Sequence, residues 1–196
     1  MKPPTPSEAG EALLDADAAA VAAVKPWQDS RAIDALGRIA SLGDQPPLRA
    51  LCGAVIAAGA LGRDKRLFRA GLRMLAAHTL ATLAKDFVKK RVDRTRPRSM
   101  DAPGKDHRPA PGRDEAKEET SFPSGHSAGA AAVGRALARD FPAAALPAYG
   151  AAGFLALAQI PRCAHYPTDV GVGVAIGVAA EAAVSFGFRA AGLEPD

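Results

Sequence analysis

Three separated clusters of side chains suited to phosphate chemistry occur along this sequence of 196 residues. The first runs from Lys89 to Arg96 in the string KKRVDRTRP, at the end of a predicted helix. Arginine presents a planar fork of donors and lysine presents a point charge, so both can bind phosphate oxygens. Taken alone, the same spacing also fits a basic helix end that complements the helix dipole.

The second cluster is the string PSGH, from Pro123 to His126. Ser124 and Gly125 open a predicted helix, and the free N–H groups and positive dipole end of a helix start favour an anion. Serine adds a hydroxyl donor, and glycine allows the anion to approach the backbone closely. His126 could give a proton to a leaving oxygen. The alternative is that Ser124 is an ordinary N-cap beside an incidental histidine.

The third cluster is the string HYPTD, from His165 to Asp169, in which Pro167 suits the first turn of a helix. A spacing of four residues would let the carboxylate accept from one imidazole nitrogen and fix the tautomer. The other nitrogen would then be a nucleophile toward phosphorus. An isolated His–Asp pair is more often structural, but this pair shares the chain with two other phosphate-type clusters.

In order and type, the three clusters resemble the signature of the type 2 phosphatidic acid phosphatase (PAP2) superfamily, which is KxxxxxxRP, then PSGH, then a stretch ending in HxxxD. The resemblance implies that His165 attacks phosphorus, that Asp169 orients it and that His126 protonates the leaving group. It also implies a phosphohistidine intermediate that water cleaves, with no metal or other cofactor. The phosphoryl oxygens would be held by Lys89, Arg96, Ser124 and the Gly125 N–H.

One departure from the family pattern affects the third cluster. The family usually has Ser-Arg before the nucleophile, with the arginine six residues ahead of it, whereas this chain has Ala158 and Gln159 there. Arg162 stands only three residues before His165. Either Arg162 reaches the phosphate from this different position, or Gln159 replaces the charged fork with neutral hydrogen bonds. Loss of the charged contact would weaken transition-state binding.

The elements that must position these clusters are predicted to be helices. The sequence is rich in alanine and glycine, with few aromatic residues and few β-branched runs, which favours close helix packing. Apolar periodicity and capping residues predict helices at 11–24, 29–42, 47–62, 68–90, 124–139, 143–160 and 168–188. We therefore expect an all-α bundle of about five core helices, with an amphipathic N-terminal segment over 1–45, a PAP2-like domain over 46–190 and a loop over 91–122.

Membrane insertion is tested by the length of the apolar runs. A span needs about 20 apolar residues, and only the run from Phe141 to Pro161 is that long without a charge. Lysine and arginine near helix ends can extend to the membrane surface, and helices rich in small residues pack well in bilayers. We therefore predict a transmembrane bundle, in a bacterial-type inner or plasma membrane. The predicted helix over 29–42 has one apolar face that could lie on the membrane surface or pack on the core.

Charge and cysteine content narrow the class of partner. A formal charge of +4 fits an anionic partner, but a short basic run, few aromatics and no recognised motif disfavour nucleic acid. Cys52 and Cys163 lack the spacing of a zinc site or a disulfide framework.

Three functions compete on these observations. The leading hypothesis is an integral membrane phosphatase that acts on a lipid phosphate or polyprenyl diphosphate. The second is a soluble acid phosphatase or vanadate-dependent haloperoxidase, which share the same anion-binding residues. The N-terminal string MKPPTPSE shows no secretory signal and the chain is short, which count against both of these. The third is a membrane-attached module that binds an anion without turnover. The replacement of the usual arginine by Gln159 would indicate this loss of activity.

Overall fold

The computed structural model describes residues 5–193, which form seven α-helices and a two-stranded antiparallel sheet. Capping residues explain several helix starts, because Thr5, Ser30 and Asp64 each accept a hydrogen bond from a backbone N–H of the first turn. The helices are α1 (Pro6–Val24), α2 (Arg31–Ala40), α3 (Gln45–Leu61), α4 (Lys65–Lys89), α5 (Gly125–Asp140), α6 (Ala145–Leu157) and α7 (Pro167–Ala190), and the strands are β1 (Val92–Asp93) and β2 (Ala110–Pro111).

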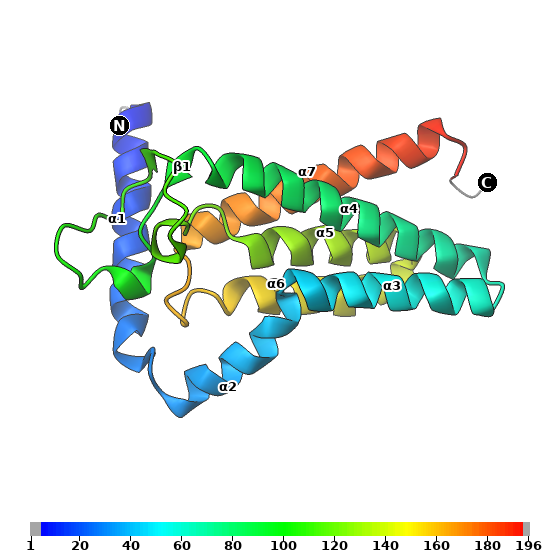
Figure 1. Ribbon diagram of the computed structural model, residues 1–196, viewed down its shortest axis with the longest axis horizontal. Coiled ribbons are helices and arrows are strands. Elements are labelled where there is room, and N and C mark those ends of the chain that lie inside the picture. The colour runs from blue at the N-terminus through cyan, green and yellow to red at the C-terminus, as the bar shows by residue number, and fades with distance from the viewer. Residues whose placement is uncertain (1–4, 194–196) are drawn as a thin grey trace.

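Helices α3 to α7 run side by side as an elongated bundle, while α1 lies across one end of it (Figure 1). Helix α5 is central and packs against α4, α6 and α7, and α3 packs on α4. The loop that connects α4 to α5 lies at the same end as α1 (Figure 1). The carboxyl end of α4 and the amino ends of α5 and α7 therefore meet there, and these ends carry the three sequence clusters.

The predicted all-α bundle is confirmed, and each of the seven predicted helices is present. The loop between α4 and α5 is more ordered than its composition suggested. Its backbone pairs with itself, since the Arg94 N–H donates to the Glu119 carbonyl at 2.7 Å and the Ser121 N–H donates to the Arg94 carbonyl at 3.0 Å. The division of the chain at residue 45 stays a prediction.

The prediction of which segment could cross a membrane was wrong in detail. The charge-free run from Phe141 to Pro161 contains only the shorter helix α6, because a 3-10 turn precedes it and irregular turns follow Leu157. Within residues 5–193, α7 is the one helix that is both long and apolar enough to span a bilayer. Its apolar run is interrupted by one charged residue, Glu181. That carboxylate is buried and accepts from Arg135 and Arg139 of α5, so its charge faces the bundle and not the surroundings.

Glycine allows these helices to approach one another closely. A Cβ atom at Gly177 of α7 would lie 2.3 Å from the Ala128 carbonyl oxygen of α5, and one at Gly173 would lie 2.5 Å from the Ser124 oxygen. A Cβ at Gly59 of α3 would lie 2.3 Å from the Phe68 nitrogen of α4. These contacts are with backbone atoms, which cannot move aside without shifting a helix. The small-residue composition thus sets the distance between α5 and α7.

Replacing Gly177 with alanine should force α7 away from α5 and lower the free energy of unfolding by about 1–3 kcal/mol. The matched control is Gly187→Ala in the same helix, where a Cβ would meet no atom within 4 Å. That change should be neutral or slightly stabilising, because alanine has the higher helix propensity. Denaturant unfolding of both variants in the same detergent compares them directly, and equal midpoints would contradict the close packing of α5 on α7.

Candidate active site

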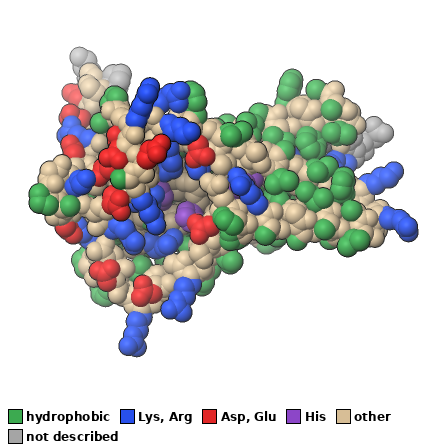
Figure 2. Space-filling model, in the orientation of Figure 1, with side chains coloured by type: hydrophobic (Ala, Val, Ile, Leu, Met, Phe, Trp, Pro, Cys, Tyr) green, Lys and Arg blue, Asp and Glu red, His purple; other side chains and the backbone are tan. Residues whose placement is uncertain are grey.

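Most of the predicted site residues line one cavity of about 330 Å³ at the end of the bundle where α4, α5 and α7 meet. Figure 2 shows histidine side chains in a hollow of the charged half of the molecule, while the other half is mostly hydrophobic. Asp169 and Ser124 do not line the cavity and are fully buried next to it. The predicted residues that do line it are Lys89, Arg96, Gly125, His126, Arg162 and His165.

His165 stands just before α7, and its imidazole orientation is fixed by the α4–α5 loop. Its Nδ1 lies 2.7 Å from the Ser121 carbonyl oxygen, whereas the nearest Asp169 oxygen is 3.7 Å away. The predicted pairing of His165 with Asp169 is seen at this ion-pair distance, which is longer than a hydrogen bond, so a direct hydrogen bond between them stays a prediction. A carbonyl can only accept, so Nδ1 must carry the proton and Nε2 keeps its lone pair.

The protonation state of His165 follows from its burial. Burial lowers the pKa of His165 to about 4, and the positive charges of Arg96 and Lys89 act in the same direction. The nearby Asp169 carboxylate raises the pKa but does not overcome burial. The imidazole is consequently neutral at pH 7, which is the form that has a nucleophilic nitrogen.

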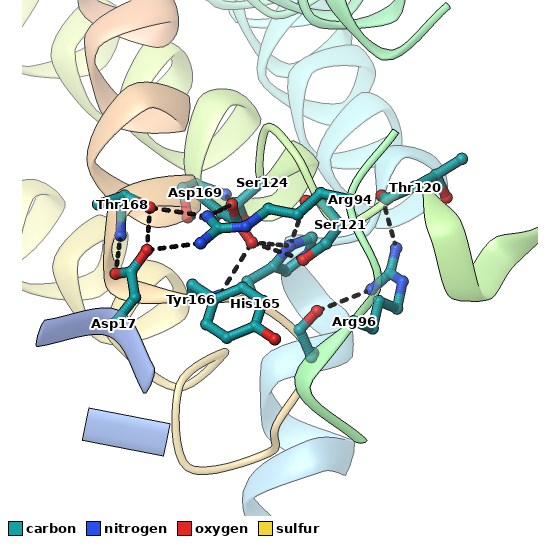
Figure 3. A network of polar contacts seen from close by, with 12 residues as sticks. Asp17, Arg94, Arg96, Thr120, Ser121, Ser124, His165, Tyr166, Thr168 and Asp169 are labelled. Carbon is teal, nitrogen blue, oxygen red and sulfur yellow. Dashed lines mark hydrogen bonds and ion pairs between the residues drawn. The ribbon is translucent and has the colours of Figure 1, made fainter. Parts of the chain in front are cut away.

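Asp169 positions His165 through an intermediate residue. Its Oδ2 accepts from the Ser121 hydroxyl at 2.5 Å and from the Tyr166 N–H at 2.9 Å (Figure 3). Ser121 therefore bonds the carboxylate with its side chain and the imidazole with its carbonyl. Any displacement of Asp169 would shift Ser121 and, with it, the acceptor that holds His165.

Arg94 is the main site residue that sequence reasoning missed. Its guanidinium is buried and donates to Asp169 at 2.5 Å and to Asp17 of α1 at 2.7 Å (Figure 3). It also lies over the Tyr166 ring, 4.0 Å from the centroid. The basic run by itself does not indicate that Arg94 is buried and paired while its neighbour Arg91 is exposed. The reason is that the partner of Arg94, Asp17, lies 77 residues away in the chain. Only the fold shows which arginine is paired.

Asp17 links the first helix of the chain to the start of α7. Its Oδ1 accepts from the Thr168 N–H at 2.9 Å, and its Oδ2 accepts from the Thr168 hydroxyl as well as from Arg94. The side chain is 1 % exposed. A carboxylate suits this position because the N–H groups at a helix start are unpaired and the dipole there favours negative charge.

Lys89 and Arg96 contact only backbone carbonyls. Lys89 donates to the Thr120 carbonyl, and Arg96 donates to the carbonyls of Lys117, Ala164 and Thr120 at 2.7, 3.1 and 3.3 Å. Among residues 5–193 no carboxylate forms an ion pair with either side chain. Burial and the nearby Arg96 lower the pKa of Lys89 to about 7, while Asp169 and Asp86 raise it. A phosphoryl dianion at the cavity wall would favour the charged form of Lys89 and would bind both side chains.

The start of α5 forms another part of the wall. Ser124 is the N-cap, and its Oγ accepts from the Ser127 N–H at 3.4 Å and from the Ser127 hydroxyl at 2.8 Å. The role of Ser124 as a phosphate donor stays a prediction. Gly125 does face the cavity, and a Cβ there would lie 3.3 Å from the Lys85 side chain. The helix start thus presents backbone N–H groups close to the two unpaired cations.

His126 is held by a residue that the sequence did not indicate. Its Nε2 lies 2.8 Å from Asp44 Oδ1, and Asp44 comes directly before α3. Both side chains line the cavity. This contact orients His126 and brings a single carboxylate to the site.

Gln159 and Arg162, the two alternatives for the missing family arginine, contact each other at the cavity wall. Gln159 is fully buried, donates to the Leu155 carbonyl at 2.9 Å and accepts from Arg162 Nη1 at 3.0 Å. Gln159 therefore orients Arg162, which lines the cavity. Whether Arg162 or Gln159 serves a phosphate there stays a prediction. Burial and the nearby Arg98 lower the pKa of Arg162, while Asp44 raises it.

Replacing Arg94 with methionine would leave two buried carboxylates without their cation, so the free energy of unfolding should fall by about 3–5 kcal/mol. Adding Asp17→Asn removes one of these charges, and the double variant should lose less than the sum of the single changes. Arg91→Met is the control, because Arg91 is exposed and bonds only the Phe87 carbonyl beyond its ring contact. Denaturant unfolding measures all four, and equal losses at Arg91 and Arg94 would contradict the assigned pairing.

Comparison with known proteins identifies the family of this chain. Residues 70–190 match the PAP2 superfamily, and they include all three clusters. Decaprenylphosphoryl-5-phosphoribose phosphatase from Mycobacterium tuberculosis is 34 % identical over 136 residues, which cover 67 % of each chain.

Two solved structures share the fold. The transmembrane PAP2 type phosphatidylglycerolphosphate phosphatase from Bacillus subtilis aligns with a TM-score of 0.65 and 25 % identity, over 91 % of this chain and 86 % of that one. LpxE from Aquifex aeolicus aligns with a TM-score of 0.57 and 20 % identity, over 82 % and 91 % of the two chains. The sequence clusters, the shared fold and the curated relative show that this chain belongs to the PAP2 superfamily and is a phosphatase of that family.

Proposed function

We propose that this phosphatase hydrolyses a lipid phosphate or diphosphate through a phosphohistidine on His165, without a metal ion. The observation that carries the proposal is the grouping in one cavity of a neutral buried histidine, two cations without carboxylate partners and a second histidine. These are the nucleophile, the phosphate-binding groups and the acid that in-line displacement at phosphorus requires.

In the first step the Nε2 lone pair of His165 forms a bond to phosphorus as the bond to the leaving oxygen breaks. His126 gives that oxygen a proton. A lipid monophosphate then releases a neutral alcohol, and a lipid diphosphate releases a lipid monophosphate. In the second step His126 takes a proton from water, whose oxygen attacks phosphorus and displaces His165. Lys89, Arg96 and the Gly125 N–H stabilise the charge on the phosphoryl oxygens throughout.

The outer surface of the bundle supports a lipid substrate. Large hydrophobic side chains are exposed along the helices and include Leu83, Phe87, Leu146, Leu157 and Phe186. Figure 2 shows this hydrophobic half beside the charged half that holds the site. We infer that the bundle crosses a membrane of the bacterial inner or plasma type, with the cavity at its surface. A lipid could then place its phosphate in the cavity while its hydrocarbon chain stays in the bilayer.

The names of the relatives point to the same substrate class. The Mycobacterium tuberculosis relative is named for a decaprenyl-linked phosphoribose, and the Bacillus subtilis structure for phosphatidylglycerolphosphate. Each name describes a phosphate carried by a lipid. A polyprenyl-linked or glycerolipid phosphate is therefore the substrate class that we assign to this chain.

The proposal is tested by phosphate release from phosphatidic acid and a polyprenyl diphosphate in detergent. Release should persist in excess EDTA and should fall to background in His165→Ala, because the nucleophile is then absent. The control is His107→Ala, which removes an imidazole from the α4–α5 loop that does not line the cavity. A need for added divalent cation, or near-normal release by His165→Ala, would overturn the mechanism.

The role of His126 predicts a dependence on the leaving group. In His126→Ala, release of a lipid alcohol should slow by about 10²–10⁴-fold, because the alcohol leaves poorly without a proton. The first step with para-nitrophenyl phosphate should slow far less, because the nitrophenolate leaves without protonation. Rapid mixing should therefore show a burst of nitrophenolate in the variant. If both substrates slow by the same factor, His126 does not act as the acid.

A further inference from the structure

Arg98 and Arg162 border two neighbouring hollows at the site end of the molecule. Both line the catalytic cavity, and both line a second groove of about 490 Å³ whose other wall is α2 with the turn before it. They therefore stand at the boundary between the phosphoryl site and the groove. Any substrate group that extends from the catalytic cavity toward α2 must pass these two guanidinium groups.

The two arginines are held in place without being neutralised. Arg98 donates from Nη2 to the Arg162 carbonyl at 2.8 Å, and Arg162 donates from Nη1 to Gln159 at 3.0 Å. A Cβ at Gly37 of α2 would lie 3.3 Å from Arg162 Nε, so α2 supports that side chain. No carboxylate among the described residues forms an ion pair with either arginine. Each guanidinium has five N–H donors, and most of them remain open to a ligand.

The charge of the cavity exceeds what one phosphoryl group requires. Its wall carries the side chains of Lys89, Arg96, Arg98, Lys117 and Arg162, against the single carboxylate of Asp44, which contacts His126. A phosphate monoester has a charge of at most about −2, which Lys89 and Arg96 can balance. Among the remaining cations, Arg98 and Lys117 are exposed, so solvent screens part of their repulsion. A further anion between Arg98 and Arg162 would remove the rest.

We infer that Arg98 and Arg162 form a second anion subsite, which binds a further phosphate group of the same lipid substrate. This inference rests on the proposed function and narrows it, since it favours a diphosphate or a lipid with two separate phosphates over a simple monophosphate. Arginine suits the task because its planar fork binds two phosphate oxygens at once. Gln159 contributes by orienting Arg162 and by keeping the position beside it neutral.

The subsite is tested by calorimetry, which measures how tightly three phosphonate probes bind to the purified full chain in detergent. The probes are methylphosphonate, methylenediphosphonate with adjacent phosphonates, and propane-1,3-bisphosphonate with separated ones, none of which can be hydrolysed. One of the two bisphosphonates should bind at least about tenfold more tightly than methylphosphonate. Preference for the adjacent pair would indicate a diphosphate substrate, and preference for the separated pair a substrate with two distinct phosphates.

Arg98→Gln should reduce the bisphosphonate preference by about tenfold, and Arg98→Lys should retain part of it by keeping the charge. Arg108→Gln is the matched control, because Arg108 is an exposed arginine of the same loop that does not line the cavity. The subsite is overturned if Arg98→Gln weakens mono- and bisphosphonates by the same factor or weakens neither. A melting curve of each variant identifies any loss that comes from unfolding.

Turnover measurements separate this inference from the proposed function. If the chain hydrolyses lipid phosphates but shows no bisphosphonate preference, the subsite is wrong and the phosphatase assignment stands. If the preference depends on Arg98 while no lipid phosphate is hydrolysed, the subsite stands and the proposed function is wrong.

Discussion

The guanidinium of Arg94 lies between the carboxylates of Asp17 and Asp169, and all three side chains are buried. Charges in such a place cost several kcal/mol each in desolvation unless hydrogen bonds satisfy them. Here the donors come from Ser121 of the loop and from Tyr166 and Thr168 at the start of α7. The network therefore joins α1, the loop and α7, because none of these segments can move without exposing an unpaired charge.

Two arginines that lie two residues apart in this region have different contacts. Arg94 forms ion pairs with two acidic side chains and so links the segments that carry them. Arg96 donates hydrogen bonds to backbone carbonyls, which leave its positive charge without an ion-paired carboxylate. Between them the backbone pairs with residues 118–121, which places Ser121 beside both Asp169 and His165. The result is a neutral imidazole, oriented by a carbonyl, beside basic side chains that have no ion-paired carboxylate among the described residues.

The bundle supplies the rigid support for this arrangement. Glycines let α7 approach the backbone of α5, and the buried Glu181 of α7 pairs with Arg135 and Arg139 of α5. Figure 2 shows hydrophobic side chains along the helices and a mixture of acidic and basic side chains at the site end, with exposed basic residues such as Arg63 and Lys65 at the opposite end. A membrane enzyme that handles an anionic headgroup requires this separation, because the hydrocarbon core excludes charge while the headgroup region accepts it.

The helices, the all-α class and the three clusters could be predicted from the sequence alone, because apolar periodicity, capping residues and motif spacing are local properties. The sequence also predicted His165, His126, Lys89, Arg96 and Gly125, and the structure brings these residues to one cavity. Three contacts follow only from the folded chain: the Ser121 carbonyl is the nearest hydrogen-bond partner of the imidazole, Arg94 pairs with Asp17, and Gln159 orients Arg162. The first two are contacts between segments distant in the chain, and the third depends on how the turn after α6 folds, so spacing alone could not fix any of them.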